Sequence, residues 1–456
     1  MKLFNYIQLL GLHIIIGFAV YLLPVLAKVY LFSIFVFFLL RVLGTKQSKR
    51  ALQILIACGY ITGVEVFLRM TQGSILYETS KYMVIVFCLI GFFTVKLNKQ
   101  SIIYVFYIFL LIPGIFITGF NITENTALRQ AISFNLSGPL SLGVVALFCY
   151  KLKIKYADTH KILLAIGLPL ITMTTYVFLY NPDIKEVVTG TYSNYATSGG
   201  FGPNQVSTVL GFGMFIFTTR FFLQSPTFIL KVLNLVLLVL VSYRGVITFS
   251  RGGVITGVII LVAFLYSYYK KSSVTNKKRA LRLVFVLTMV TVSTWVFTSI
   301  QTDGFIDKRY ANQDARGRVK EDLTTGRNQL ISFELEEFFK NPLLGVGVGK
   351  IKELRSDEQG ISAASHNEMS RILSEHGTLG LIAFLIILIV PLTLRLRDRS
   401  NIFFFSCYIF WFLTINHSSM RIVAPSFIYG LSLLHFVYKP SKKQLKQPVK
   451  TIKTAH

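Results

Sequence analysis

Long apolar runs recur along most of this chain, and many of them are about as long as a lipid bilayer is thick. The first covers residues 7–27, and others follow at 30–42 and 52–70. A spanning helix needs about 20 mostly apolar residues, whereas a spanning strand alternates in polarity over about 10 residues. The runs do not alternate, and 53% hydrophobic residues exceed what a water-soluble core requires. The sequence therefore predicts an all-α polytopic membrane protein.

Polar breaks divide the apolar runs into about 12–14 predicted spans. Lys2 followed by an apolar run resembles a signal peptide, but no small-residue cleavage site follows and a further apolar run begins after Lys28. We therefore interpret this run as the first span. The predicted spans have centres near residues 16, 36, 60, 89, 110, 140, 170, 212, 238, 260, 290, 386, 408 and 430.

Basic residues gather in every second loop, which is the pattern of cytoplasmic loops. The net charge of +27 comes from these clusters rather than from a nucleic-acid-binding motif, so we predict no nucleic-acid partner. Both termini are then predicted to be cytoplasmic. The loops at about 71–80, 121–130, 181–203, 301–376 and 415–421 face outward, and the clusters are Arg41/Lys46/Lys49/Arg50, Lys96/Lys99, Lys151/Lys153/Lys155/Lys161, residues 270–282, Arg395/Arg397/Arg399 and the tail.

One outer loop is much longer and more acidic than the others. The loop at 301–376 holds 13 of the 20 acidic residues and 11 Lys or Arg, so we expect a small soluble subdomain. Within it, Arg327–Lys340 has the pattern of an amphipathic helix ended by Asn341-Pro342, and a second helix is predicted from His366 to Glu375. The predicted domains are spans at 1–300 (about 11), the loop, spans at 377–438 (about three) and a basic tail at 439–456.

The most suggestive titratable side chains stand where the long loop returns to the membrane. His366 could accept a proton near neutral pH, and Glu368 and Glu375, seven residues apart on one helix face, could orient it. The alternative is a polar helix start in which Ser365 or Asn367 caps the helix, Glu368 favours its positive end and Arg371/Glu375 is a surface pair. His376 is interpreted as an interfacial residue.

Arginines at predicted outer span ends form a second group. Arg251, followed by two glycines at a helix start, suits a phosphate, and Arg244 would face the same way if the helix were continuous. Snorkelling toward water is the alternative for both. Arg327 stands at a helix start where the dipole disfavours a cation, so a bound anion or full solvation would explain it.

Two further outer turns carry polar residues. Pro203-Asn204 opens a span, where capping is the leading interpretation and a contact in the site is the second. His417 and Arg421 precede the last span and either mark the interface or add a cation to the site. The run Gly345-Val346-Gly347-Val348-Gly349 does not follow a strand, so we interpret it as a flexible turn rather than a nucleotide loop.

Taken in order, several of these motifs form a recognisable set. They are Ser250-Arg251-Gly252-Gly253, Gly326-Arg327, Pro342 with Gly345 and Gly347, His366-Asn367, and Glu375 with Gly377. The set spans about 130 residues and resembles the O-antigen ligase and polymerase superfamily. The N-terminal half is similar only in hydropathy, apart from the Pro203-Asn204 site.

The resemblance implies a GT-C-like membrane glycosyltransferase of the bacterial inner membrane. Such an enzyme moves a glycan from undecaprenyl diphosphate to a hydroxyl on the periplasmic face, with inversion and with neither metal nor other cofactor. The acceptor is lipid A core for a ligase and another lipid-linked glycan for a polymerase. The resemblance implies His366 as the base and Arg251 and Arg327 as diphosphate ligands; Arg244 is our own third candidate, and Asn204, Asn367 and Arg421 are candidate contacts.

Two other classes of protein compete with an enzyme. A transporter or flippase would carry ionisable groups along a path through the membrane, and here these groups are few: Glu65, Arg69, Arg220 and Arg244. Glu65 could act in a relay, although pairing with Arg69 four residues later is the simpler interpretation. A membrane scaffold leaves the ordered Arg and His motifs unexplained. Ligase, polymerase and protein O-glycosylation stay open.

Overall fold

The computed structural model describes residues 3–121, 125–321 and 326–438. Lys2 and the basic tail predicted at 439–456 lie outside the described residues. The helices and strands are α1 (Leu3–Leu22), α2 (Leu26–Leu43), α3 (Gln47–Met70), α4 (Thr79–Thr94), α5 (Ile102–Asn121), α6 (Asn125–Cys149), β1 (Lys153–Lys155), α7 (Tyr156–Tyr180), α8 (Pro203–Leu223), α9 (Phe228–Ile247), α10 (Arg251–Lys271), α11 (Val274–Gln301), α12 (Phe305–Tyr310), α13 (Arg327–Lys340), α14 (Lys350–Gln359), α15 (Glu368–Arg397), α16 (Phe404–His417), α17 (Ala424–Ser432) and β2 (His435–Val437).

Eleven regions of the described chain are helices long and apolar enough to cross a membrane. They are α1 to α3, α5 to α11 and α15. Each predicted span centre lies within an α-helix. The prediction of an all-α polytopic membrane protein is therefore confirmed.

Three of the predicted spans are shorter helices, namely α4, α16 and α17. The last of these has only 9 residues, and all of them are buried. A helix of that length rises about 14 Å, which is less than half of the hydrocarbon core. Its backbone ends are compatible with this depth because protein rather than lipid surrounds them.

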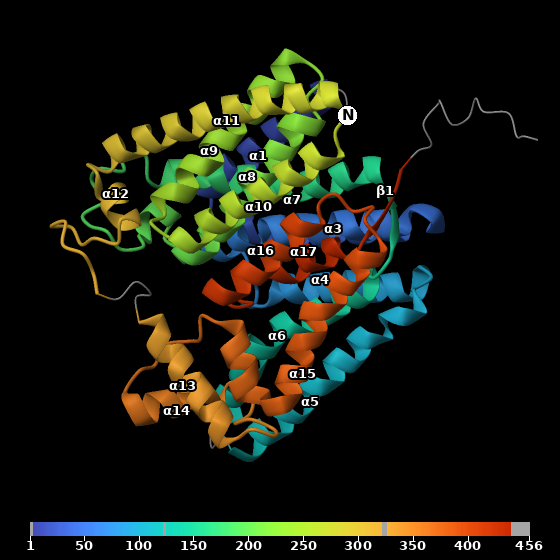
Figure 1. Cartoon of the computed structure of the whole chain (residues 1–456), viewed down its shortest axis with the longest axis vertical. Coiled ribbons are helices and arrows are strands. Elements are labelled where there is room, and N and C mark those ends of the chain that lie inside the picture. The colour runs from blue at the N-terminus through green and yellow to red at the C-terminus, as the bar shows by residue number, and fades with distance from the viewer. Residues whose placement is uncertain (1–2, 122–124, 322–325, 439–456) are drawn as a thin grey trace, which may run out of the picture.

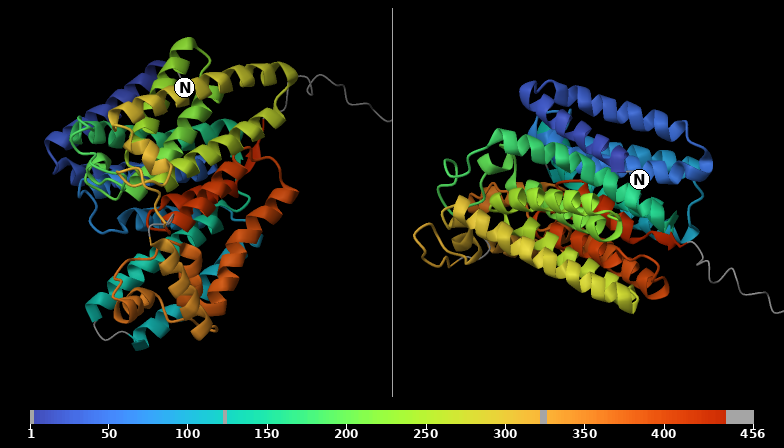
Figure 2. Two further views of the ribbon diagram at one scale, coloured as in Figure 1. Left: turned by 60° about the vertical axis from the view of Figure 1, so that its left-hand side comes forward. Right: turned by 90° about the horizontal axis from the view of Figure 1, so that it is seen from above.

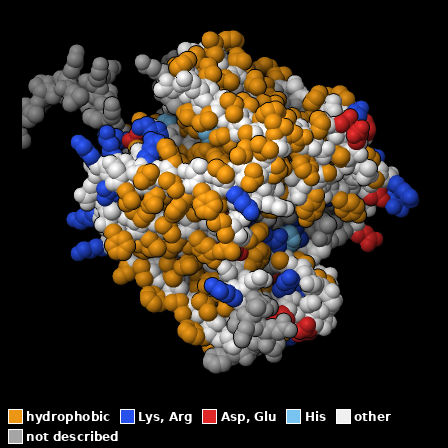
Figure 3. Space-filling view, turned by 180° about the vertical axis from the view of Figure 1, so that it is seen from behind, with side chains coloured by type: hydrophobic (Ala, Val, Ile, Leu, Met, Phe, Trp, Pro, Cys, Tyr) orange, Lys and Arg blue, Asp and Glu red, His pale blue; other side chains and the backbone are white. Residues whose placement is uncertain are grey.

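The long helices lie side by side, with the connecting helices α12, α13 and α14 gathered on one side of the bundle (Figure 1). The view from above shows the same arrangement (Figure 2). Both ends of the described chain lie on the opposite side, where β1 pairs in parallel with β2 through Ile154 and Phe436. This small sheet was not predicted, because three residues are too few to show a pattern. From behind, hydrophobic side chains cover most of the surface, and Lys and Arg gather toward one end (Figure 3).

Helix α8 lies at the centre of the bundle and packs closely on α10. A Cβ on Gly211 would meet the Gly253 carbonyl oxygen at 2.3 Å, and one on Gly257 would meet Gly211 Cα at 2.8 Å. Small residues of this kind let two helix backbones approach each other without lipid between them. Gly253, the second of the two glycines that follow Arg251, makes room for α8.

The helices of the long loop, which we predicted to be a small soluble subdomain, pack on two different partners. Helix α12 packs on the end of α11, where Trp295 Nε1 donates to Asp307 Oδ1 at 2.8 Å. Helices α13 and α14 pack instead on α15. The predicted helix Arg327–Lys340 is confirmed as α13. The second predicted helix is the first part of α15, which begins at Glu368 and turns sharply into the span at Gly377 (φ 61°, ψ −140°).

Candidate functional site

Arg251 stands at the first position of α10, directly after a break in the chain. Helix α9 ends at Ile247, and Phe249 takes a left-handed backbone conformation with φ 57°. Asn204, at the start of α8, accepts a hydrogen bond from Ser250 Oγ through its side-chain oxygen at 2.7 Å. The amide of Asn204 therefore holds the break that orients Arg251. It does so from outside the α9–α10 segment, which the sequence could not show.

The break separates Arg244 from Arg251, so the two residues do not lie on one continuous helix. Arg244 is 1% exposed, and its guanidinium lies 4.0 Å from the centre of the Phe178 ring. Its Nη2 donates to the Asn181 carbonyl at 2.9 Å. These contacts direct the Arg244 side chain toward the end of α7, and the structure does not bring it to Arg251.

His417 lies against the start of α10. Its Nδ1 donates to the Leu413 carbonyl at 2.8 Å, and its Nε2 lies 3.2 Å from Thr208 Oγ1. A Cβ on Gly252 would lie 2.6 Å from the imidazole. Gly252 is thus the residue that allows His417 to approach the Arg251 backbone.

Arg309 is a residue of this site that we did not predict. It belongs to α12, is 9% exposed, and its Nε donates to the Phe249 carbonyl at 2.9 Å. Arg251 Nη1 reaches the Arg309 carbonyl at 3.4 Å. Burial, with the charges of Arg251 and Arg327 added to it, lowers the pKa of Arg309 to about 10. No short motif marks Arg309, because only the packing of α12 brings it here.

Arg327 joins the same group from α13. Its pKa is lowered by burial and, secondarily, by the charges of Arg421 and Arg251. The arginines at 251, 309, 327 and 421 therefore form one cluster, called here the arginine cluster. Within the described residues, no carboxylate forms an ion pair with Arg309, Arg327 or Arg421. Gathering like charges is unfavourable unless an anion is bound between them.

Arg421 supports the segment that carries His366. Its Nη2 donates to the carbonyls of Ala364 at 3.1 Å and Ser365 at 2.7 Å. Its own carbonyl accepts from Arg69 Nη1 at 2.9 Å. Arg69 in turn pairs with Glu65 at 2.6 Å, as we predicted, and both side chains are buried. Arg69 of helix α3 thus stabilises the turn at residue 421.

His366 is the titratable base beside the arginine cluster. Burial, followed by the charges of Arg421 and Arg327, lowers the pKa of its imidazole to about 3. The ring is therefore neutral at physiological pH. Its Nδ1 has no hydrogen-bond partner within the described structure. The next residue, Asn367, caps α15 by accepting from the backbone N–H groups of Met369 and Ser370 at 2.9 and 3.1 Å.

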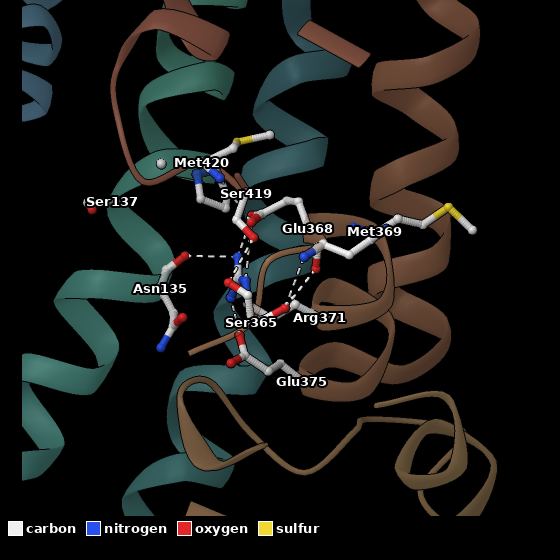
Figure 4. A network of polar contacts seen from close by, with 12 residues as sticks. Asn135, Ser137, Ser365, Glu368, Met369, Arg371, Glu375, Ser419 and Met420 are labelled. Atoms are coloured by element: carbon white, nitrogen blue, oxygen red, sulfur yellow. Dashed lines mark hydrogen bonds and ion pairs between the residues drawn. The ribbon is translucent and has the colours of Figure 1, made fainter. Parts of the chain in front are cut away.

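Glu368 and Glu375 flank Arg371 rather than His366 (Figure 4). All three side chains are buried, so the Arg371/Glu375 pair is not a surface pair. Glu368 also accepts from the Met420 N–H at 3.2 Å, and Arg371 donates to the Asn135 carbonyl of α6 at 3.0 Å. The carboxylates share one helix face, as we predicted, and their role in the reaction stays a prediction.

The glycine run at 345–349 wraps tightly around the end of this buried group and is not a flexible turn. The backbone N–H of Gly349 donates to Glu375 Oε1 at 2.8 Å. Gly345 has φ 71°, and a Cβ there would lie 2.5 Å from the Glu375 carbonyl carbon. A side chain at 345 would therefore force the run away from α15. His376 is likewise buried, against Gly114 of α5.

A second buried pair holds the loop helices together. Glu334 of α13 accepts from Arg355 Nη1 of α14 at 3.2 Å and from Ser370 Oγ of α15. Arg355 is fully buried and also donates to the Ala363 carbonyl. The segment from 363 to 370 is therefore held at both of its ends, by Arg355 at Ala363 and by Glu334 at Ser370, and these contacts position His366.

The arrangement combines a cluster of arginines with a neutral imidazole at the end of the spans. Guanidinium groups bind phosphate oxygens through paired N–H groups. A neutral imidazole can take a proton from a hydroxyl. Within the described residues, no group of three or more His, Cys, Asp or Glu is placed to hold a metal ion.

Comparison with known families gives a match over part of the chain. Residues 233–385 match the family model described as O-antigen ligase. The match runs from α9 to the middle of α15 and so includes Arg251, Arg309, Arg327 and His366. No curated protein matches the chain. The chain is a multi-pass membrane protein, and its segment from residue 233 to residue 385 is similar to the O-antigen ligase family.

Proposed function

We propose that this protein transfers a glycan from undecaprenyl diphosphate to a hydroxyl acceptor at the periplasmic face of a bacterial inner membrane. The observation that carries the proposal is the arginine cluster beside a neutral His366. Diphosphate is the leaving group of such a transfer, and its developing charge must be stabilised. Arginines from α10, α12, α13 and the turn at 421 supply that charge.

In the proposed reaction the acceptor oxygen attacks the anomeric carbon of the donor sugar. The new glycosidic bond forms as the bond from that carbon to the diphosphate oxygen breaks, so the configuration inverts. His366 takes the proton of the attacking hydroxyl, and undecaprenyl diphosphate leaves with the electron pair. The arginines compensate the diphosphate charge where a divalent cation could otherwise do so, and the proposed reaction uses no metal or other cofactor.

Glu368 and Glu375 act in this proposal as positioning residues. Both carboxylates hold Arg371, and Glu368 also holds the backbone of Met420, next to Arg421. Asn367 caps the same helix, and its Nδ2 donates to Asn416 Oδ1 at 3.0 Å. These contacts fix the position of His366 relative to the turn at 421. We place Arg244 outside the diphosphate site.

The cluster predicts the effect of removing one cation. Arg327→Ala should lower kcat about 10²- to 10³-fold, because the transition-state charge loses a preorganised donor. The kcat of Arg327→Lys should lie between those of the wild type and Arg327→Ala, since lysine keeps the charge and loses the paired N–H groups. The measurement is transfer by the purified protein from an undecaprenyl-diphosphate-linked glycan to its acceptor.

A matched control lies in the same loop. Arg318 is largely exposed and pairs with Asp314 at 2.7 Å, so Arg318→Ala should leave the transfer rate unchanged. Equal transfer rates for the two alanine variants would overturn the diphosphate role of Arg327.

In a deletion strain, long lipid-linked chains left unattached indicate a lost ligase, and attached single repeats indicate a lost polymerase.

The pKa of His366 predicts an unusual pH dependence. Its value of about 3 lies below the ordinary 6.5, so the free enzyme keeps the neutral base throughout mild acid. A bound diphosphate would offset the charges of Arg421 and Arg327 and so raise this pKa. We expect the acid limb of kcat, which reflects the substrate complex, at higher pH than that of kcat/KM. Coincident limbs would contradict this coupling.

A further inference from the structure

A basic pocket lies at the opposite end of α8 from the arginine cluster. Arg220 follows Asn204 by 16 residues on this helix, which corresponds to about 24 Å along its axis. The pocket has a volume of about 700 Å³. Its polar lining includes Tyr6, His160, Lys161, Arg220, Gln224 and Arg279, and no carboxylate lines it.

Arg220 is a buried cation without an ionic partner in the described structure. It is 5% exposed, and its Nε donates to Tyr6 Oη at 3.2 Å and to Asn234 Oδ1 at 3.3 Å. Its guanidinium lies 4.2 Å from the centre of the Tyr6 ring. Among the described residues, no carboxylate forms an ion pair with Arg220, and Arg220 lines the pocket. A cation buried in a membrane protein is unfavourable without a partner, so an anionic ligand is expected.

The remaining cations of the pocket support the same charge preference. Arg279, on α11, is exposed and forms no ion pair within the described residues. Lys161 pairs with Asp158 at 2.6 Å, but both are partly exposed, so this pair screens little of the pocket. The ligand that fits these groups carries a phosphate, which guanidinium binds through paired N–H groups.

An apolar groove of about 540 Å³ adjoins the basic pocket. It runs between α1, α2, α3 and α7, and its lining includes Leu12, Ile16 and Phe37. Lys161 and Leu164 line both cavities, so the two meet on α7. A ligand that uses both must have a phosphate at one end and a hydrocarbon chain at the other.

We propose that this composite site binds an anionic phospholipid from the leaflet at this end of the spans. The headgroup phosphate lies on Arg220 and Arg279, and an acyl chain lies in the groove along α1. A soluble phosphate would use the basic pocket and leave the apolar groove unexplained. Clustered cations between membrane helices are a known means of selecting anionic lipid. The site is independent of the proposed transfer reaction, because it lies at the other end of α8.

The test is native mass spectrometry of the full chain in detergent. Phosphatidylglycerol is compared with phosphatidylcholine of the same acyl chains, and inorganic phosphate is a third arm. Arg220→Gln should weaken phosphatidylglycerol binding about tenfold or more, since a buried charged hydrogen bond is lost. Arg279→Gln, at an exposed position, should weaken it about threefold.

Two further variants keep the proposal falsifiable if Arg220→Gln folds poorly. Arg282→Gln removes an exposed cation one turn along α11 that does not line the pocket, so it should bind as the wild type does. Ser33→Trp fills the groove from an exposed position and should reduce lipid binding alone. The proposal would be overturned if the two lipids bound equally well, or if Arg279→Gln and Arg282→Gln weakened lipid binding equally. It would also be overturned if inorganic phosphate competed fully with the lipid.

Discussion

His366→Ala is expected to lower glycan transfer by about 10²- to 10⁴-fold, which is the range that a general base contributes. The variant keeps the backbone carbonyl of residue 366, which accepts from the Ser419 N–H at 3.1 Å. It also keeps the contacts of Arg421 with Ala364 and Ser365. The loss should therefore fall on kcat, while donor binding by the arginine cluster changes little.

The measurement is single-turnover transfer by purified protein, together with the surface glycan profile of a complemented deletion strain. His435→Ala is the control, because His435 lies at the other end of the bundle and pairs there with Asp398 at 2.6 Å. It should transfer glycan at the wild-type rate. A His366→Ala protein that is present in the membrane and still makes glycan of normal length and yield would rule out His366 as the base.

Arg371→Met is expected to cause the largest loss of stability. Glu368 and Glu375 are 1% and 0% exposed, and Arg371 is the cation that both contact. Removing one partner from a buried ion pair costs about 3–5 kcal/mol, because the other charge stays buried without compensation. Two carboxylates are stranded here, so we expect a loss at or above the upper end of that range, seen as a lower apparent Tm in detergent and less protein in the membrane.

A triple variant separates this effect from a simple loss of packing. Arg371→Met combined with Glu368→Gln and Glu375→Gln removes all three charges, so it should recover part of the lost stability. Arg318→Met removes one partner of a largely exposed pair and should change stability by about 0–1 kcal/mol. An apparent Tm for Arg371→Met equal to that of Arg318→Met would show that the carboxylates do not depend on Arg371.

Much of the architecture could be predicted from hydropathy along the chain. Burial in lipid selects long apolar runs, and such runs are readable without any tertiary information. The loop helix from Arg327 to Lys340 could be predicted as well, because its apolar period and the following Asn341-Pro342 are local signals. Helices α12 and α14 were missed, since α12 has only 6 residues and α14 is strongly polar.

The candidate site was only partly predictable, because most of its contacts join segments far apart in the sequence. Arg251 and Arg327 carry local marks, such as adjacent glycines and a helix start. Arg309 carries no such mark, and it enters the cluster only because α12 packs near Phe249. Asn204 reaches Ser250 across 46 residues, a contact that no spacing rule anticipates.

Hydropathy along the chain is enough to predict that it crosses a membrane many times and carries one long polar loop before its last helices. The sequence also marked His366 and three arginines of the cluster, Arg251, Arg327 and Arg421, as candidates, because titratable residues next to apolar runs stand out against their neighbours. Which charged side chains contact one another depends on the tertiary structure. In the folded chain, Arg371 is buried between two carboxylates, and the Arg244 side chain is directed away from Arg251. The helices of the long loop pack on two different groups of helices. Those outcomes depend on which helix faces pack together, and packing is a property of the whole chain rather than of any segment.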